Sequence, residues 1–221
     1  MARATLSKYK WKRLAEEALR NALRLHMDSM LLHEYESYPS AFQLSVLALE
    51  ELSKAKMVSH YYYSSITNEG FPDAAFEQEW LSILYSHVDK QFALVARDMF
   101  DYSPKFVQFI REKGLDMKKQ RATYVGLERL GRRVNVAGRI STPDRVKAKD
   151  SKQLITFLND EFLAIYNTIC VACDYFGIPE VDAVLDPDKH QFVFAWPHRS
   201  GLRGRHFLKH HLSTADARHA S

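Results

Sequence analysis

The sequence predicts an all-α protein, a helical bundle of four to five helices with an irregular basic insertion. Long stretches repeat apolar residues at helical spacing, and glycine and proline fall mainly in the short segments between them. With 221 residues, of which 46% are hydrophobic, the chain can bury the core of one domain. We therefore expect a single helical domain over residues 1–221, made of core helices (1–110), a basic irregular insertion (111–150), a long helix (151–177) and an irregular basic tail (178–221).

The first two predicted helices cover residues 7–36 and 39–63. Leucine and alanine form one stripe along the first, and the second is nearly apolar all round between residues 41 and 49, as expected for a helix enclosed by others. Because a residue before proline disfavours helical geometry, we expect Tyr38 to be non-helical.

Glu51 falls on the apolar stripe of the second helix, and Lys54 lies beside it one turn later. A buried carboxylate is costly unless a cation pairs with it. A third helix is predicted over residues 74–102, where His87 and Lys90 lie one turn apart. We expect these two residues to meet Glu51 and Lys54.

The second half of the chain is less regular. Ser103 and Pro104 predict the start of a short helix that stops at Gly114. Over residues 116–140 the helical periodicity weakens, and we expect short extended pieces such as TYV (123–125) and RVNV (133–136). A helix restarts at Thr142-Pro143, the long helix follows over 151–176, and residues 191–196 (QFVFAW) resemble a strand.

Cys170 and Cys173, the only cysteines, form a CxxC within the apolar long helix, which favours small core or interface thiols over a redox or zinc site. No apolar run has the length of a membrane span, and the basic start lacks the apolar core of a signal peptide. We expect a cytoplasmic protein with no membrane partner.

The net charge of +4 is unevenly distributed. Residues 111–152 carry a balance of +8 and residues 189–221 a balance of +5, which leaves the rest of the chain acidic. Two basic segments on an acidic body are compatible with a polyanion such as RNA, or with solvated loops alone.

Four landmarks in order then resemble the AbiV family of abortive-infection proteins: NALRLHMDSMLL, SAFQLSVLALEELSKAK, the pair His87 and Lys90, and KKQRATYVGL followed by a proline. The resemblance covers roughly residues 14–160. It singles out Glu50, Glu51, Lys54, His87, Lys90, Arg121 and Tyr124. Gly126 stands where the family pattern leads us to expect an acidic residue, which puts a role for that position in doubt.

The AbiV pattern is similar to the HEPN superfamily of helical bundles, which often dimerise and many of which cut RNA without a metal. Their nuclease pattern is arginine, a polar residue, any three residues, then histidine, and residues 205–210 (RHFLKH) match it. The resemblance thus implies that His210, or else His87, is the acid/base, that Arg205, Lys54 and Lys90 hold phosphate, and that Glu51 orients the cations. Further RNA contacts are expected from Arg121, Tyr124, Arg132, Arg133 and His206.

Two alternatives stay open at this point. One is a non-catalytic dimeric translation inhibitor or adaptor that binds RNA or protein through its basic surface, and the other is a structural role for the Glu51, Lys54, His87 and Lys90 network. The expected partners are RNA, a second copy of the chain and a phage or host protein that activates it. No cofactor and no metal site are expected, because there is no glycine-rich phosphate loop or metal-ligand set.

Overall fold

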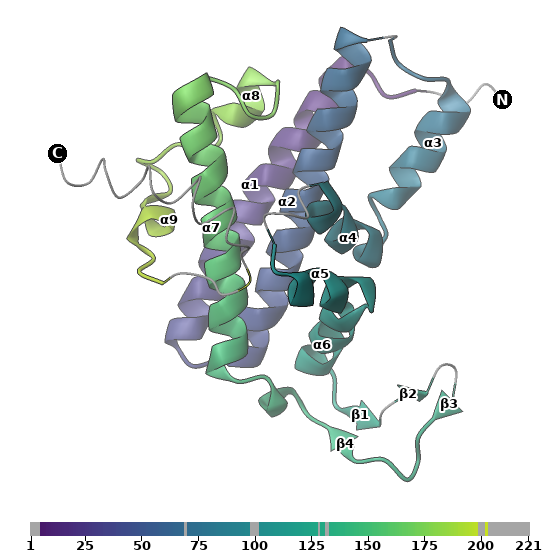
Figure 1. The fold of residues 1–221 in the computed structure, drawn as a ribbon, viewed down its shortest axis with the longest axis vertical. Coiled ribbons are helices and arrows are strands. Elements are labelled where there is room, and N and C mark those ends of the chain that lie inside the picture. The colour runs from purple at the N-terminus through teal and green to yellow at the C-terminus, as the bar shows by residue number, and fades with distance from the viewer. Residues whose placement is uncertain are drawn as a thin grey trace.

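A computed structural model describes residues 5–68, 70–97, 102–127, 129–130, 133–198 and 202, and it confirms an all-α bundle (Figure 1). Its frame is an antiparallel hairpin of α1 (Lys8–Glu34) and α2 (Tyr38–Thr67). Ser7 caps α1 by accepting from the Lys10 N–H, and Glu36, with φ of 60°, turns the chain between the helices. Tyr38 opens α2, so the prediction that it is non-helical is wrong. The first turn tolerates Pro39 because its N–H groups need no helical partner.

The third long helix, α7 (Ala148–Ala172), packs against both helices of this hairpin. Together the three helices bury most of the core, and the largest fully buried side chains on them include Trp11, Leu19, Leu23, Leu49, Leu52, Phe157 and Phe162. This packing explains the apolar character of α2, which has helices on several sides.

The predicted helix over 74–102 is wrong in its continuity. It forms α3 (Ala74–Ile83) and α4 (His87–Arg97), separated by a tight turn in which the N–H groups of Leu84, Tyr85 and Ser86 each bond the carbonyl three residues earlier. Ser86 then caps α4, because its Oγ accepts from the Asp89 N–H at 3.3 Å. The break places His87 at the first turn of a helix that packs on α2.

The short helix after Ser103 is confirmed as α5 (Pro104–Arg111), with the Ser103 hydroxyl accepting from the Phe106 N–H. We predicted that the helical region would end at Gly114, but this residue instead opens a further helix, α6 (Gly114–Thr123). Lys113 has φ of 58°, and this left-handed residue reverses the chain between the two helices. Helix α6 packs on α2 and escaped prediction because four of its ten residues are charged.

The described residues between 124 and 141, here called the arm, leave the end of α6 and extend away from the bundle (Figure 1). This region forms two small antiparallel ladders, β1 (Gly126–Leu127) with β4 (Ile140–Ser141), and β2 (Arg129–Leu130) with β3 (Arg133–Val134). The predicted extended piece RVNV is confirmed over Arg133–Val134, whereas TYV (123–125) comprises the last residue of α6 and the two residues before β1. The chain returns through the short 3-10 helix η2 (Pro143–Arg145), the first element after Thr142, and enters α7.

After α7 the chain forms two short helices, α8 (Pro179–Asp182) and α9 (Gln191–Ala195). The predicted strand at 191–196 is therefore wrong, since these residues make a helical turn that lays Val193 into the core. Cys173 ends α7 in a left-handed conformation, and both Cys170 and Cys173 are exposed rather than in the core.

By length and composition α7 could also cross a membrane, but 56% of its most apolar window is buried inside the bundle. That burial is what the core helix of a folded bundle shows.

Candidate functional site

A buried carboxylate of α2 is the centre of the candidate site, and it belongs to Glu50 rather than to Glu51. Glu50 is 1% exposed, whereas Glu51 is only partly buried and pairs with Lys54 on its own helix at 2.6 Å. The prediction that Glu51 points at the core is therefore wrong. The stripe on which Glu51 lies is only one of the two buried faces of α2, and Glu50 follows Val46 on the other.

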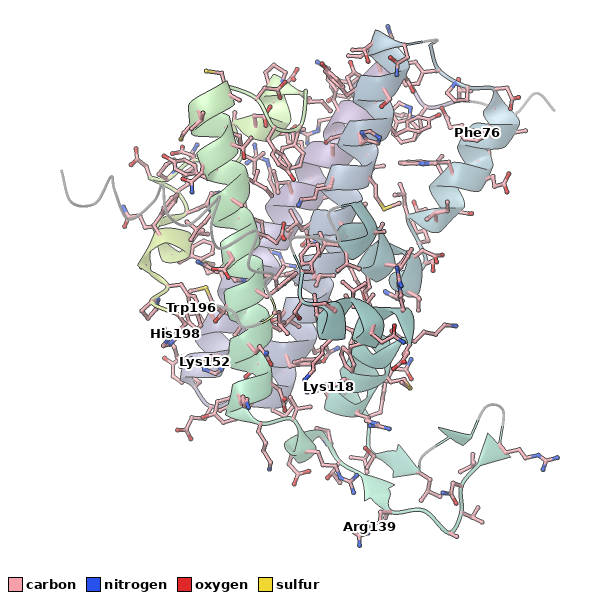
Figure 2. The ribbon with its side chains drawn as sticks, in the orientation of Figure 1. Phe76, Lys118, Arg139, Lys152, Trp196 and His198 are labelled. Carbon is pink, nitrogen blue, oxygen red and sulfur yellow. The ribbon has the colours of Figure 1, made fainter. Side chains whose placement is uncertain are left out.

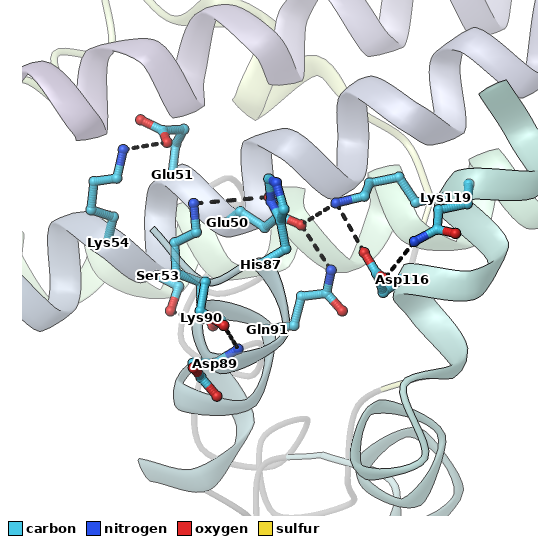
Figure 3. Close-up of polar contacts among 12 residues, drawn as sticks. Glu50, Glu51, Ser53, Lys54, His87, Asp89, Lys90, Gln91, Asp116 and Lys119 are labelled. Carbon is cyan, nitrogen blue, oxygen red and sulfur yellow. Dashed lines mark hydrogen bonds and ion pairs between the residues drawn. The ribbon is translucent and has the colours of Figure 1, made fainter. Parts of the chain in front are cut away.

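Glu50 accepts hydrogen bonds from three side chains on two other helices (Figure 3). From α4, His87 Nδ1 lies 2.6 Å from Oε2 and Gln91 Nε2 lies 2.8 Å from Oε1. From α6, Lys119 Nζ lies 2.9 Å from Oε1. A carboxylate that receives several donors, one of them a cation, is compensated for the loss of water that burial imposes.

His87 joins this buried carboxylate to the surface. Its side chain is 55% exposed, although Nδ1 is bonded to Glu50. Because an ionised carboxylate can only accept, Nδ1 carries the proton, and in the neutral ring Nε2 keeps its lone pair. The geometry thus fixes one tautomer of an imidazole that solvent and ligands can reach.

Lys90 is also beside Glu50, with Nζ 4.0 Å from Oε2, and it is 5% exposed. Burial lowers the pKa of Lys90 below its usual value, and the Glu50 carboxylate only partly offsets this. The backbone carbonyl of Lys90 accepts from Ser53 Oγ at 2.6 Å, which fixes α4 against α2. His87 and Lys90 do lie beside a glutamate of α2, but that glutamate is Glu50 and not the predicted Glu51.

Three residues of the cluster were not predicted as part of it: Gln91, Lys119 and Asp116. Asp116 lies 3.2 Å from Lys119 on α6 and shares that cation with Glu50. Gln91 follows His87 by one turn on α4, so the spacing that joined His87 to Lys90 also pointed to it. Lys119 and Asp116 were not found, because helical periodicity weakens from Asp116 onwards and no helix was predicted there.

The remaining predicted residues are not beside Glu50. Arg121 is exposed on α6, Tyr124 follows that helix with 68% of its surface exposed, and Arg133 is exposed on β3. Tyr124 and Arg133 lie on the arm, and Arg121 lies at the end of α6 from which the arm extends. Arg132, Arg205, His206 and His210 lie outside the described residues.

A second buried ion pair connects α2 to α7. Lys56 Nζ lies 2.8 Å from Glu161 Oε2, and Tyr102 donates its hydroxyl to Glu161 Oε1 at 2.9 Å. Although burial alone would lower it, the Glu161 carboxylate raises the pKa of Lys56 above its usual value. Both charged groups are almost fully buried, so this pair holds the helices together.

Within the parts of the chain that the structure describes, no group of three or more His, Cys, Asp or Glu side chains is placed to hold a metal ion. The chemistry available at Glu50 and His87 is proton transfer beside cations.

The comparison with protein families decides the identity of the chain. The HEPN_AbiV family model, described as AbiV, matches residues 10–164, which is more than half of the sequence. The chain belongs to the AbiV family. Searches of curated proteins and of solved structures gave no match. The matched region contains α1 to α6, the arm and most of α7, and therefore every residue of the Glu50 cluster. Membership indicates an abortive-infection function of the HEPN type.

Proposed function

We propose that this AbiV-family protein is a metal-independent endoribonuclease in which His87 transfers the proton. One observation carries the proposal: the His87 ring is held by the buried Glu50 through Nδ1 while more than half of its side chain is exposed. An exposed imidazole needs no buried carboxylate for stability, but a general base does need an orienting group.

RNA suits such a site because it carries its own nucleophile. His87 Nε2 takes the proton of a 2′-hydroxyl, the 2′-oxygen attacks the adjacent phosphorus, and the bond to the 5′-oxygen breaks. The products are a 2′,3′-cyclic phosphate and a 5′-hydroxyl, whose proton comes from water or a second acid. No metal enters this scheme.

The lysines beside His87 supply positive charge for the phosphate. Lys54, at 18% side-chain exposure, is the more accessible and is oriented by Glu51. Lys90 and Lys119 are buried, so we assign them the role of holding the Glu50 side chain in place. Arg121, Tyr124 and Arg133 are further candidates for contact with the RNA chain, around the arm.

The reaction class is tested with purified protein and total RNA in excess EDTA, followed by analysis of the product ends. We expect cleavage with 2′,3′-cyclic or 3′-phosphate ends, and no cleavage of an oligonucleotide whose riboses are replaced by 2′-deoxyriboses. Cleavage of the deoxy substrate, or strict dependence on a divalent ion, would contradict the proposal.

A non-catalytic growth inhibitor or adaptor is the second candidate. It is favoured by the arm, which extends away from the bundle (Figure 1) and carries exposed side chains that RNA or a protein partner can reach. In that case growth arrest on expression would survive His87→Ala and be lost in Arg133→Glu.

A further inference from the structure

A pocket of about 710 Å³ lies between the C-terminal part of α2 and helix α3, and it shares no residue with the Glu50 cluster. The rings of Tyr61, Phe76 and Trp80 line it, together with hydroxyl and amide groups of α2. Phe76, which is 51% exposed, lies on α3 at the upper right of Figure 2. The volume is within the range of pockets that bind small molecules.

The aromatic wall of this pocket belongs to a cluster of three rings from three helices. The ring centroid of Tyr61 lies 4.4 Å from that of Trp80 on α3 and 4.7 Å from that of Trp11 on α1. Trp11 is fully buried, whereas Trp80 is only partly buried and lines the pocket beside Tyr61. Because the faces of tyrosine and tryptophan rings carry partial negative charge, a ligand in the pocket meets an electron-rich surface.

Glu77 places a carboxylate beside this aromatic cluster. It is 0% exposed, its Oε1 accepts from the Leu6 N–H at 2.6 Å, and its Oε2 has no hydrogen-bond partner among the described residues. Burial and the Glu77 carboxylate together raise the pKa of the Tyr61 hydroxyl, so this carboxylate acts on a residue of the pocket wall.

Glu77 differs in its surroundings from the two other buried glutamates of the described bundle. Glu50 pairs with Lys119 at 2.9 Å. Glu161 pairs with Lys56 at 2.8 Å. Within the described parts of the chain no lysine or arginine pairs with Glu77, and none of the described residues that line the pocket is a lysine or arginine. A buried carboxylate without a counter-ion is unfavourable, so a cation that enters the pocket stabilises the folded protein.

We propose that the pocket between α2 and α3 binds a small organic ammonium cation, which lies against Tyr61 and Trp80 and is attracted through space by Glu77. The aromatic faces attract the positive charge, and the alkyl groups of the ligand pack on the apolar ring surface. A neutral ligand would leave the carboxylate uncompensated, and an anion would be repelled by it. The inference does not depend on RNA cleavage, because the pocket and the Glu50 cluster are separate.

Binding is tested by NMR titration of the 25.6 kDa chain with choline, with butylammonium and with the neutral isostere of choline, in which a carbon atom replaces the nitrogen. The indole N–H signals of the tryptophans are the reporters. Trp80 lines the pocket, whereas Trp196 donates its indole N–H to Thr156 and is the internal control. We expect a saturable shift of the Trp80 signal with the cations, and binding of the neutral isostere weaker by about tenfold or more.

A matched pair of variants tests the role of the charge. Glu77→Gln removes the carboxylate charge but keeps an oxygen that accepts from the Leu6 N–H, and Glu79→Gln removes an exposed carboxylate of the same helix. We expect Glu77→Gln to weaken choline binding by about tenfold, and Glu79→Gln to leave it nearly unchanged. Trp80→Leu keeps an apolar side chain but removes the aromatic face, and calorimetry should detect no choline binding to it. Circular dichroism verifies the helical content of each variant.

Three results would overturn the proposal: no shift of the Trp80 signal with either cation, equal binding of the neutral isostere, or undiminished choline binding by Glu77→Gln. The last result would mean that Glu77 serves only to hold the chain at Leu6. If Glu77→Gln does not fold, Trp80→Leu decides, and undiminished choline binding by that variant would overturn the proposal.

Discussion

Glu50 and Glu51 are sequence neighbours with opposite surroundings, and the difference is the main residue-scale result. Sequence reasoning predicted correctly that a glutamate of α2 meets His87 and Lys90, because a buried carboxylate needs donors and these lie one turn apart. It chose the wrong glutamate because α2 has two buried faces. The partner that decides between them, Lys119, comes from α6.

The two glutamates form a matched pair for mutation. Glu50→Ala leaves the buried Lys90 and Lys119 without their carboxylate, and we expect it to lower the free energy of unfolding by about 3–5 kcal/mol. Glu51→Ala removes a pair made by partly exposed groups within one helix and should cost about 1 kcal/mol or less. Urea unfolding followed by circular dichroism measures both. Equal losses of unfolding free energy in the two variants would mean that Glu50 is not the carboxylate that holds the buried lysines.

His26 on α1 is a second residue whose burial has a measurable consequence. It is fully buried, its Nε2 lies 3.1 Å from Asn159 Oδ1, and its Nδ1 has no partner. Burial lowers the pKa of His26 to about 4, although the bond to Asn159 acts in the opposite direction. A proton on Nδ1 would have no acceptor.

The folded protein should therefore lose stability as the pH falls through this window. The unfolded chain takes up the His26 proton near pH 6.5, whereas the folded chain does so only near pH 4, so stability is full above 6.5 and declines towards 4. The contribution of His26 amounts to about 3 kcal/mol. Urea unfolding of the wild type and of His26→Gln at several pH values isolates it by difference. An equal pH dependence of the two proteins, or an NMR titration of His26 near pH 6.5, would contradict this assignment.

At the scale of elements, the helix starts were predictable where a cap stands in the sequence, and the breaks were not. Ser103 and Pro104 were found, but Ser86 was overlooked because the apolar residues around it continue at helical spacing. The end of α5 was predicted close to its place, at Gly114, but the restart of a helix there was not. The left-handed residue that turns the chain is Lys113 rather than a glycine, so the sequence carries no sign of a turn between two helices.

Helix α3 offers a direct test of capping. Asp73 Oδ1 accepts from the N–H groups of Ala75 and Phe76, each at 2.9 Å. We expect Asp73→Ala to lower the free energy of unfolding by about 1 kcal/mol, and Asp73→Asn, which keeps an accepting oxygen, to have less effect. Thermal and urea unfolding measure both variants. If Asp73→Ala were no less stable than Asp73→Asn, the cap would not matter to α3.

At the scale of the whole molecule, the bundle was predictable because its three long helices repeat their apolar residues over many turns. The basic insertion was recognised, but not that it divides into a core helix that completes the Glu50 cluster and an arm that leaves the bundle. Such a division depends on tertiary packing, which the local pattern of apolar residues in the sequence does not reveal.

The measurement that most directly tests the central claim compares RNA cleavage in EDTA by the wild type and three histidine variants of verified fold. His87→Ala removes the exposed imidazole held by Glu50, His210→Ala disrupts the tail motif, and His198→Ala is a control in the C-terminal region. We predict that His87→Ala lowers the cleavage rate by about a hundredfold or more, as for loss of a general acid or base, while His198→Ala cleaves normally. Undiminished cleavage by His87→Ala would contradict the account, and loss in His210→Ala alone would place the reaction at the tail.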